Sequence, residues 1–206
     1  MSPIVVHHPL AQHILTQLRD ERTTPDRFRP LSQTLTTVLV LEATRKMPVR
    51  TCRVQTPLTE TQGIELAHNL AAVPILRAGL GMLETVLNLF PSVTVGYIGL
   101  ERNEETALAR TYYSKLPSLA NRFTLCLDPM LATGGSAVRA LTLLKEAGAQ
   151  DLTMVSIVSA PEGIEEVASQ HPDVPIFTAA IDSGLNDLKY IVPGLGDFGD
   201  RLYGTG

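Results

Sequence analysis

The chain has 206 residues, of which 44% are hydrophobic and 18% charged, and its formal net charge at pH 7 is −4. This balance is typical of a globular protein with one full core, and it excludes an intrinsically disordered chain. The small negative charge excludes a surface that attracts nucleic acid over its whole extent, although a local basic patch stays open.

Cysteine usage and the N-terminus bear on the cellular compartment. Cys52 and Cys126 form no CxxC motif and have no histidines at a metal-binding spacing. We interpret both as reduced thiols rather than as a disulfide or as zinc ligands. The N-terminus lacks the pattern of a signal peptide, and no apolar run has the length of a membrane span. These features predict a soluble, cytoplasmic protein with no membrane contact.

Helical patterns come first in the chain. Leu10, Ile14 and Leu18 recur at a spacing of four, which predicts a helix with one apolar face. A second helix is expected from Pro25 to Lys46. Pro48 then ends it, because the residue before a proline disfavours the helical conformation.

Strands and helices alternate through the rest of the chain. Apolar runs predict buried strands at residues 71–76, 93–101, 122–128, 152–160 and 174–181. Helices are expected between them, at residues 80–90, 136–148 and 161–171. Continuous apolar strands between helices predict a parallel sheet covered on both faces. Ligands of such sheets bind at the carboxyl ends of the strands, in the loops that lead to helices.

The stretch "LCLDPMLATGGS" is one such loop. Asp128 ends the strand, where its carboxylate can accept hydrogen bonds from ribose hydroxyls. Gly134 and Gly135 allow positive φ and a close approach to an anion, so the turn and the following helix start can form a phosphate cradle. Thr133 and Ser136 add hydroxyl donors. The alternative is a turn without a ligand, in which Ser136 caps the helix.

The stretch "PILRAGLGM" places Arg77 at the end of another predicted strand. A guanidinium offers a planar fork of donors to phosphate oxygens, and the small neighbours Ala78 and Gly79 let the backbone approach a ligand. The alternative is a surface arginine without a ligand.

Arg102 follows the predicted strand at residues 93–101 and begins a charged, polar segment that extends to Tyr112 and Tyr113. This composition predicts a mobile hairpin or lid. The alternative is a solvated hairpin without a role, and we favour that interpretation for the glutamates of the segment.

The C-terminal stretch "YIVPGLGDFGDRLYGTG" contains Gly194, Gly196 and Gly199, which match GxGxxG. We reject a dinucleotide site, because that fingerprint needs a preceding strand, a following helix and an acid about 20 residues further on. The chain ends seven residues after Gly199. The glycines instead predict a loop that wraps a ligand with backbone groups, and the apolar residues among them predict that the loop packs.

The motifs "VPILRAGLGM", "DPMLATGGSAV" and "YIVPGLGD", in this order, resemble uracil phosphoribosyltransferase of the type I phosphoribosyltransferase family. The resemblance extends from Leu41 to the C-terminus. It implies an α/β fold of phosphoribosyltransferase type, with an open, mainly parallel sheet and helices on both faces. A single domain, 1–206, would comprise an N-terminal helical part (1–46) and a C-terminal base-binding hood (182–206).

The resemblance also implies a pyrimidine salvage reaction, in which the phosphoribosyl group of 5-phospho-α-D-ribose 1-diphosphate passes to uracil and gives UMP and diphosphate. Catalytic roles would fall to Arg77, Arg102, Asp128 and Asp197. Uracil would contact Ile191, Gly196, Asp197 and Phe198. Phosphoribosyl diphosphate would contact Arg77, Ala78, Gly79, Arg102, Asp128, Pro129, Met130, Leu131, Ala132, Thr133, Gly134, Gly135, Ser136 and Asp197.

Further implications concern partners. Magnesium would accompany the diphosphate without an assigned protein ligand, GTP is a possible allosteric effector, and the chain would form a homodimer or homotetramer. The reaction itself needs electrostatic stabilisation of the leaving diphosphate, which arginines and a metal ion supply. Alternatives are the same chemistry on another base, or a non-catalytic nucleotide sensor that regulates pyrimidine genes through RNA. With 17 Lys and Arg against 21 Asp and Glu and no basic run, the RNA-binding alternative is disfavoured.

Pro129 follows Asp128 where many phosphoribosyltransferases carry a second acid, and Asp-Pro at this point resembles the uracil branch of the family. Magnesium is therefore expected to rest largely on diphosphate, ribose hydroxyls and water, with help from Asp197. Two positions depart from common family patterns: Phe198 stands where many relatives carry alanine and others an aromatic residue, and Glu101 stands where a tyrosine is common. Base choice could shift if the Phe198 ring points toward the base.

Overall fold

The computed structural model describes residues 2–205 except 103–108, and it describes Arg102 and Ala109 by their backbone alone. Within this part of the chain, nine strands form one sheet. Its main order is β1 (Ile4–Val5), β11 (Ile176–Ile181), β10 (Asp151–Ser159), β8 (Arg122–Leu127), β4 (Asn69–Leu76), β6 (Tyr97–Arg102) and β7 (Ala109–Lys115), while β5 (Thr94–Val95) pairs with β4 and β9 (Met130–Leu131) with β10. The pairs are parallel except β6 with β7, so the predicted open, mainly parallel sheet is confirmed.

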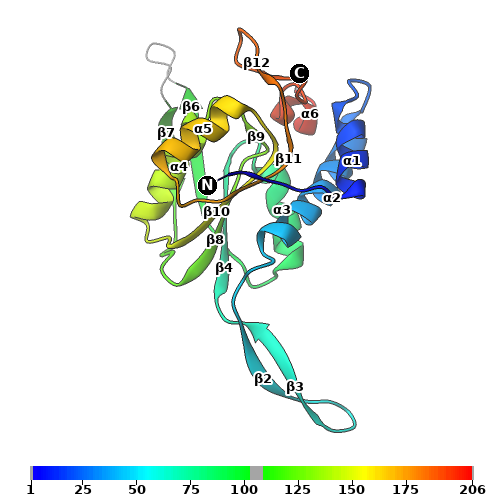
Figure 1. Ribbon diagram of the computed structural model, residues 1–206, viewed down its shortest axis with the longest axis vertical. Helices are drawn as coiled ribbons and strands as arrows, with labels where there is room; N and C mark the ends of the chain where they lie inside the picture. The colour runs from blue at the N-terminus through cyan, green and yellow to red at the C-terminus, as the bar shows by residue number, and fades with distance from the viewer. Residues whose placement is uncertain (1, 103–108, 206) are drawn as a thin grey trace.

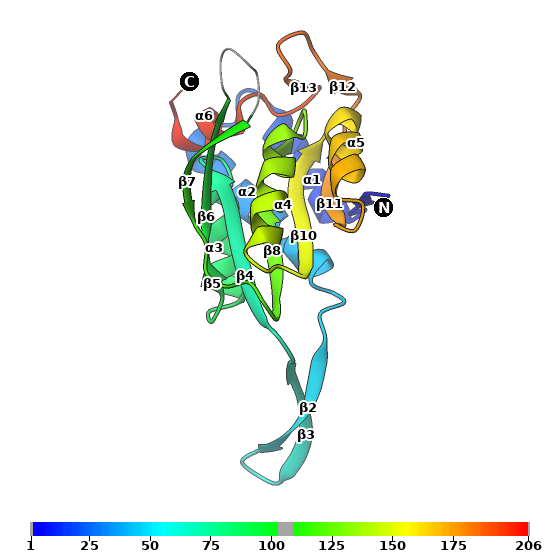
Figure 2. The ribbon, with the colours of Figure 1, turned by 90° about the vertical axis from the view of Figure 1, so that its left-hand side faces the viewer.

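Helices cover both faces of the sheet, as predicted (Figures 1 and 2). One face carries α1 (Pro9–Arg19), α2 (Pro25–Ala43) and α3 (Leu80–Leu89), and the other carries α4 (Gly135–Glu146) and α5 (Pro161–Gln170). A short helix, α6 (Phe198–Tyr203), follows at the C-terminus and packs on the side of α2.

The alternation of side chains along β4 explains this arrangement. Leu70 and Ala72 belong to the core beneath α1 to α3, whereas Ala71 and Val73 belong to the core beneath α4 and α5. Successive residues of a strand point to opposite faces, so a strand buried on both faces needs apolar residues at every position. This is why the interior strands appear in the sequence as continuous apolar runs.

Several predicted boundaries shift. The second helix ends at Ala43 rather than Lys46. The predicted strand at residues 93–101 is two strands, β5 and β6, with Gly96 between them in neither strand. Leu10 is exposed, so only Ile14 and Leu18 of the predicted apolar face are buried.

Two strands form a projecting arm that the sequence did not predict. In this arm, residues 49–66, β2 (Val49–Gln55) pairs antiparallel with β3 (Glu60–Leu66), and Leu58 at its turn is 94% exposed. The arm points away from the opposite end of the molecule, where β12 (Gly184–Leu185), β13 (Ile191–Val192) and α6 lie (Figures 1 and 2). No helix within the described residues has the length and apolar character that a membrane span requires.

Candidate active site

Two pockets adjoin at the carboxyl end of the sheet. The larger, of about 220 Å³, is lined by Ala78, Met130, Ala132, Lys189, Tyr190, Ile191, Gly196, Asp197, Phe198 and Gly199. The smaller, of about 90 Å³, is lined by Asp128, Met130, Leu131, Ala132, Thr133, Gly134, Ser136 and Ala137. Met130 and Ala132 line both, so the two pockets share a wall.

The segment from Asp128 to Ser136, here called the phosphate loop, is held by main-chain bonds to β10. Ile157 N and Val158 N both donate to Pro129 O at 3.0 Å, and Ala160 N donates to Leu131 O at 2.8 Å. Pro129 therefore contributes a backbone acceptor that joins the loop to the sheet. The ring of Pro129, in contrast, carries no group that could bind a metal ion.

Gly134 sets the shape of the turn into α4. Its φ of 85° lies in the left-handed region, and a Cβ at this position would stand 2.8 Å from the Cβ of Glu166. Gly134 occupies the N-cap position and no side-chain hydrogen bond caps α4, so the cap by Ser136 that belonged to the alternative interpretation is absent. The first backbone N–H groups of a helix have no partner within it, and those at Gly135 and Ser136 lie at an exposed helix start. The turn therefore has the geometry of an anion cradle.

Asp128 lies half-buried at the start of the phosphate loop, and burial raises the pKa of its carboxyl to about 7. The Met130 N–H, 3.5 Å from Oδ1, opposes this rise only in part. A carboxyl in this state can accept hydrogen bonds from hydroxyls once it ionises. Among the described residues, no group of three or more His, Cys, Asp or Glu side chains could hold a metal ion.

Arg77 stands exposed where β4 ends, and its peptide bond with Leu76 is cis. Its Nη2 lies 3.8 Å from Asp200 Oδ1, and Tyr203 Oη donates to Arg77 O at 3.4 Å, so the loop faces α6. Arg102 ends β6, but its side chain lies outside the described residues. The predicted lid beyond it is described only as the β6–β7 ladder, since residues 103–108 lie outside the description.

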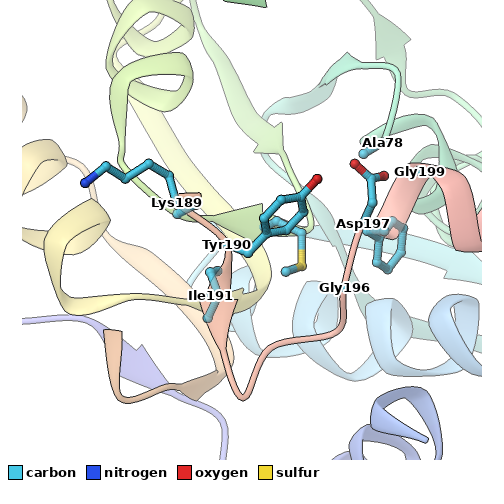
Figure 3. Close-up of a pocket in the computed structure, with 10 residues that line it drawn as sticks. Ala78, Lys189, Tyr190, Ile191, Gly196, Asp197 and Gly199 are labelled. Carbon is cyan, nitrogen blue, oxygen red and sulfur yellow. The ribbon is translucent and has the colours of Figure 1, made fainter. Parts of the chain in front are cut away.

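The four predicted uracil contacts lie together. Ile191, Gly196, Asp197 and Phe198 all line the larger pocket, and the structure adds Lys189, Tyr190 and Gly199. In Figure 3 the ring of Tyr190 extends across this pocket, whereas Lys189 points away from it. The sequence offered one signal for Tyr190, because an aromatic residue immediately precedes the predicted contact Ile191.

The orientation of the Phe198 ring bears on the choice of base. It is 2% exposed and packs edge-to-face against Phe28 of α2, with ring centroids 5.1 Å apart. The ring therefore anchors α6 to the core. Asp197, the preceding residue, is exposed and caps α6, since its Oδ1 accepts a hydrogen bond from Asp200 N at 2.9 Å.

The mainly parallel sheet, with helices on both faces and a C-terminal segment over the carboxyl end of its strands, has the fold of type I phosphoribosyltransferases. The fold is shared with APRTase from Giardia lamblia, with a TM-score of 0.54 and 16% identity over 75% of this chain and 81% of that one. The predicted fold class is thereby confirmed.

The family model described as uracil phosphoribosyltransferase matches residues 5–205, and the chain belongs to this family. It is 52% identical over 204 residues to uracil phosphoribosyltransferase from Dictyoglomus thermophilum, which covers 98% of this chain and 99% of that relative. The solved structure of the AQ2163 protein from Aquifex aeolicus is similar throughout, with a TM-score of 0.93 and 37% identity over 98% of each chain. The resemblance found in the motifs is confirmed.

Proposed function

We propose that the chain transfers the phosphoribosyl group of 5-phospho-α-D-ribose 1-diphosphate to uracil and forms UMP and diphosphate, as a salvage enzyme of the cytoplasm. The observation that carries this function is the pair of compartments that share Met130 and Ala132. One is built around an anion cradle, and the other lies under a glycine-rich C-terminal loop. A ribose that spans the shared wall would have its phosphate on one side and the base on the other.

The phosphate loop would hold the phosphoribosyl group. The amides and hydroxyls between Thr133 and Ser136 would bind the 5′-phosphate, and Asp128 would accept hydrogen bonds from the ribose hydroxyls. In the reaction the C1–oxygen bond breaks, and diphosphate leaves with its electron pair. Uracil N1 forms the new bond to C1 and releases its proton. Fixing the ribose with C1 toward the base makes this displacement effectively unimolecular.

Charge that develops on the diphosphate needs a positive environment, which Arg77 and Arg102 would provide from neighbouring strand ends. Magnesium, when bound, neutralises further charge on the diphosphate oxygens. The chain suits this ion, because magnesium usually binds through one or two carboxylates together with substrate phosphates and water. Its other ligands would be the diphosphate, the ribose hydroxyls and water, with Asp197 at the base pocket as the carboxylate that helps to hold it.

Backbone groups of residues 191–198 would recognise uracil. The base presents carbonyl oxygens on either side of one N–H, a pattern that amide N–H and carbonyl groups can match. Cytosine would leave buried polar groups unpaired, and a mismatch of this kind gives discrimination of up to about 10⁴. The burial of the Phe198 ring against Phe28 supports a backbone contact at that position.

The wider organisation is also a proposal. We infer one domain, 1–206, with an N-terminal helical part at 1–46 and a base-binding segment at 182–206. A homodimer or homotetramer is supported by apolar side chains that stand exposed along the arm, including Val49, Leu58 and Ile64. Exposed apolar surface of this kind marks interaction sites, and an isolated two-stranded hairpin is marginally stable in water. GTP as an allosteric effector rests on the family resemblance alone.

The test is to incubate the protein with phosphoribosyl diphosphate, magnesium and a panel of bases, and to identify the nucleotide formed. UMP from uracil is the expected product. A nucleotide from another base would instead support the first alternative. No product from any base, together with retention of RNA on a filter at moderate salt, would support the regulatory alternative.

A further inference from the structure

The loop at residues 193–197, here called the base loop, joins β13 to α6 and carries Gly196 and Asp197 into the base pocket. Gly194, within this loop, makes two hydrogen bonds through its backbone. Gly194 N donates to Asp182 Oδ2 at 2.8 Å, and Gly194 O accepts from Arg19 Nη1 at 2.8 Å. The backbone N–H and C=O of Gly194 are thus both bound by side chains that are distant in sequence.

Arg19 and Asp182 also form a bidentate ion pair. Arg19 Nη2 donates to Asp182 Oδ1 at 2.6 Å and Arg19 Nη1 donates to Asp182 Oδ2 at 2.9 Å. The Asp182 side chain is 4% exposed, and Arg19 reaches it from the end of α1. A fork of this geometry is a directional contact, so it fixes the position of Gly194 as well as satisfying its polar groups.

A buried ion pair seldom adds net stability, because desolvation of the two charges offsets their attraction. Stability therefore gives little reason to place this pair here. The contacts of the pair give a better reason, since both Arg19 and Asp182 bind the backbone of Gly194, two residues before Gly196. Neither Arg19 nor Asp182 lines the base pocket itself.

A second arginine joins the base loop to the same end of α1. Arg201 Nη1 donates to Leu195 O at 2.9 Å and to Leu18 O at 2.5 Å, while Nη2 donates to Asp20 O at 2.7 Å. Its guanidinium carbon lies 4.5 Å from the centre of the Phe28 ring. The C-terminal end of α1 is thus connected to two successive carbonyls of the base loop.

We propose that Arg19 and Asp182 are positioning residues for the base, which act through Gly194 to hold Gly196 and Asp197 in place. This inference rests on the proposed function of the same site. It gives α1 a role in base binding, although α1 contributes no residue to the pocket. The phosphate loop has its own bonds to β10, so the effect is confined to the base side.

The test uses Arg19→Gln, Asp182→Asn and their double variant. Because misplacement of a binding group by about 1 Å can cost up to about 10²-fold, each single variant should raise the KM for uracil by about tenfold. The KM for phosphoribosyl diphosphate should stay within about twofold, since the loop that binds it is fastened separately. The double variant should be no worse than the worse single variant, because both changes release the same residue, Gly194.

A second readout needs no turnover. Deuterium exchange at the Gly194 amide should be faster in Asp182→Asn than in the wild type, because asparagine offers one acceptor oxygen where the carboxylate offers two, and Arg19 competes with Gly194 N for it. Arg19→Lys keeps the charge but can reach fewer of the acceptors, so its KM for uracil should lie between those of the wild type and Arg19→Gln. Arg45→Gln is the control: it breaks an exposed ion pair with Glu42, in the same helical part, without contact to the base loop.

Two results would overturn the proposal: an unchanged uracil KM with unchanged exchange at Gly194, or equal increases in both KM values. A single variant leaves one buried charge unpaired and could fail to fold for that reason. The double variant removes both charges, so it is measured in that case. If the wild type makes no UMP, the proposed function fails, while the exchange readout still decides whether Asp182 holds the base loop.

Discussion

The phosphate loop and the base loop occupy one site but are built differently. The phosphate loop is nine consecutive residues, Asp128 to Ser136, fastened by backbone bonds to the neighbouring strand β10. The base loop depends on Arg19, which lies 163 residues from Asp182 and 175 residues from Gly194. The first needs the sheet alone, whereas the second also needs the N-terminal helices. Damage to either should therefore affect a different substrate.

The largest expected effect concerns Arg77, which would stabilise the leaving diphosphate and lies in neither loop. Arg77→Ala should lower kcat by about 10² to 10³-fold, because it removes positive charge from the developing diphosphate. Its side chain is 65% exposed, so the free energy of unfolding should change by no more than about 0.5 kcal/mol. Steady-state kinetics and thermal unfolding measure both.

Arg102→Ala should behave similarly in kcat. Arg50→Ala is the control, since Arg50 forms an exposed ion pair with Glu65 on the arm. Normal turnover in Arg77→Ala would remove that residue from the mechanism.

Gly134→Ala should break the phosphate loop. The left-handed φ of 85° and the contact with Glu166 at 2.8 Å leave no room for a methyl group. We expect a loss of about 1–3 kcal/mol in the free energy of unfolding and a raised KM for phosphoribosyl diphosphate. Gly135→Ala is a matched control for stability, because its added Cβ would meet no protein atom within 4 Å. Equal losses of stability in the two variants would contradict the turn geometry.

The raised pKa of Asp128 predicts that the rate of the reaction depends on pH. Ribose hydroxyls need the ionised carboxylate, so kcat/KM for phosphoribosyl diphosphate should rise with pH through about 7, the raised pKa of Asp128. Below that pH the rate should fall by about tenfold per pH unit. Asp128→Asn should have a lower rate that lacks this rise. An identical pH profile in the variant would assign the titration to another group.

The same carboxyl links folding stability to pH. The pKa of Asp128 is 3.8 as its ordinary value and about 7 in the folded protein, so in this window the folded state binds the proton that the unfolded state has lost. Its contribution to the free energy of unfolding should therefore decrease as pH rises from about 4 to about 7. Asp128→Asn should remove that component, as urea unfolding at both pH values would reveal.

Phe198→Leu should have the smallest effect on the reaction. The ring packs against Phe28, so its replacement by a smaller side chain should cost about 1–3 kcal/mol in stability. The preference for uracil over cytosine should not change, because the base would contact the backbone at this position. A shift in that preference, measured by competition between the two bases, would place the ring in the recognition of the base.

The sequence predicted the features that depend on residues close together in the chain. The continuous apolar runs predicted the sheet, and one short stretch after β8 predicted the phosphate loop. The arm was missed because its side chains are exposed on both faces, which leaves no hydrophobic alternation to detect.

The anchoring of the base loop was missed for another reason. The ion pair of Arg19 and Asp182 joins residues with no fixed spacing, and a single sequence holds no signal for such a contact. Tyr190 was present in the quoted C-terminal stretch, but only the fold brings its ring to the pocket that Met130 also lines.

A crystal structure with bound UMP would show whether the two adjoining pockets are one site. We expect the phosphate within hydrogen-bond distance of the amides between Thr133 and Ser136. We also expect the uracil ring against the backbone of Gly196 to Phe198, with the ribose between Asp128 and Met130. UMP bound elsewhere, or bound with its base away from the base loop, would contradict this arrangement.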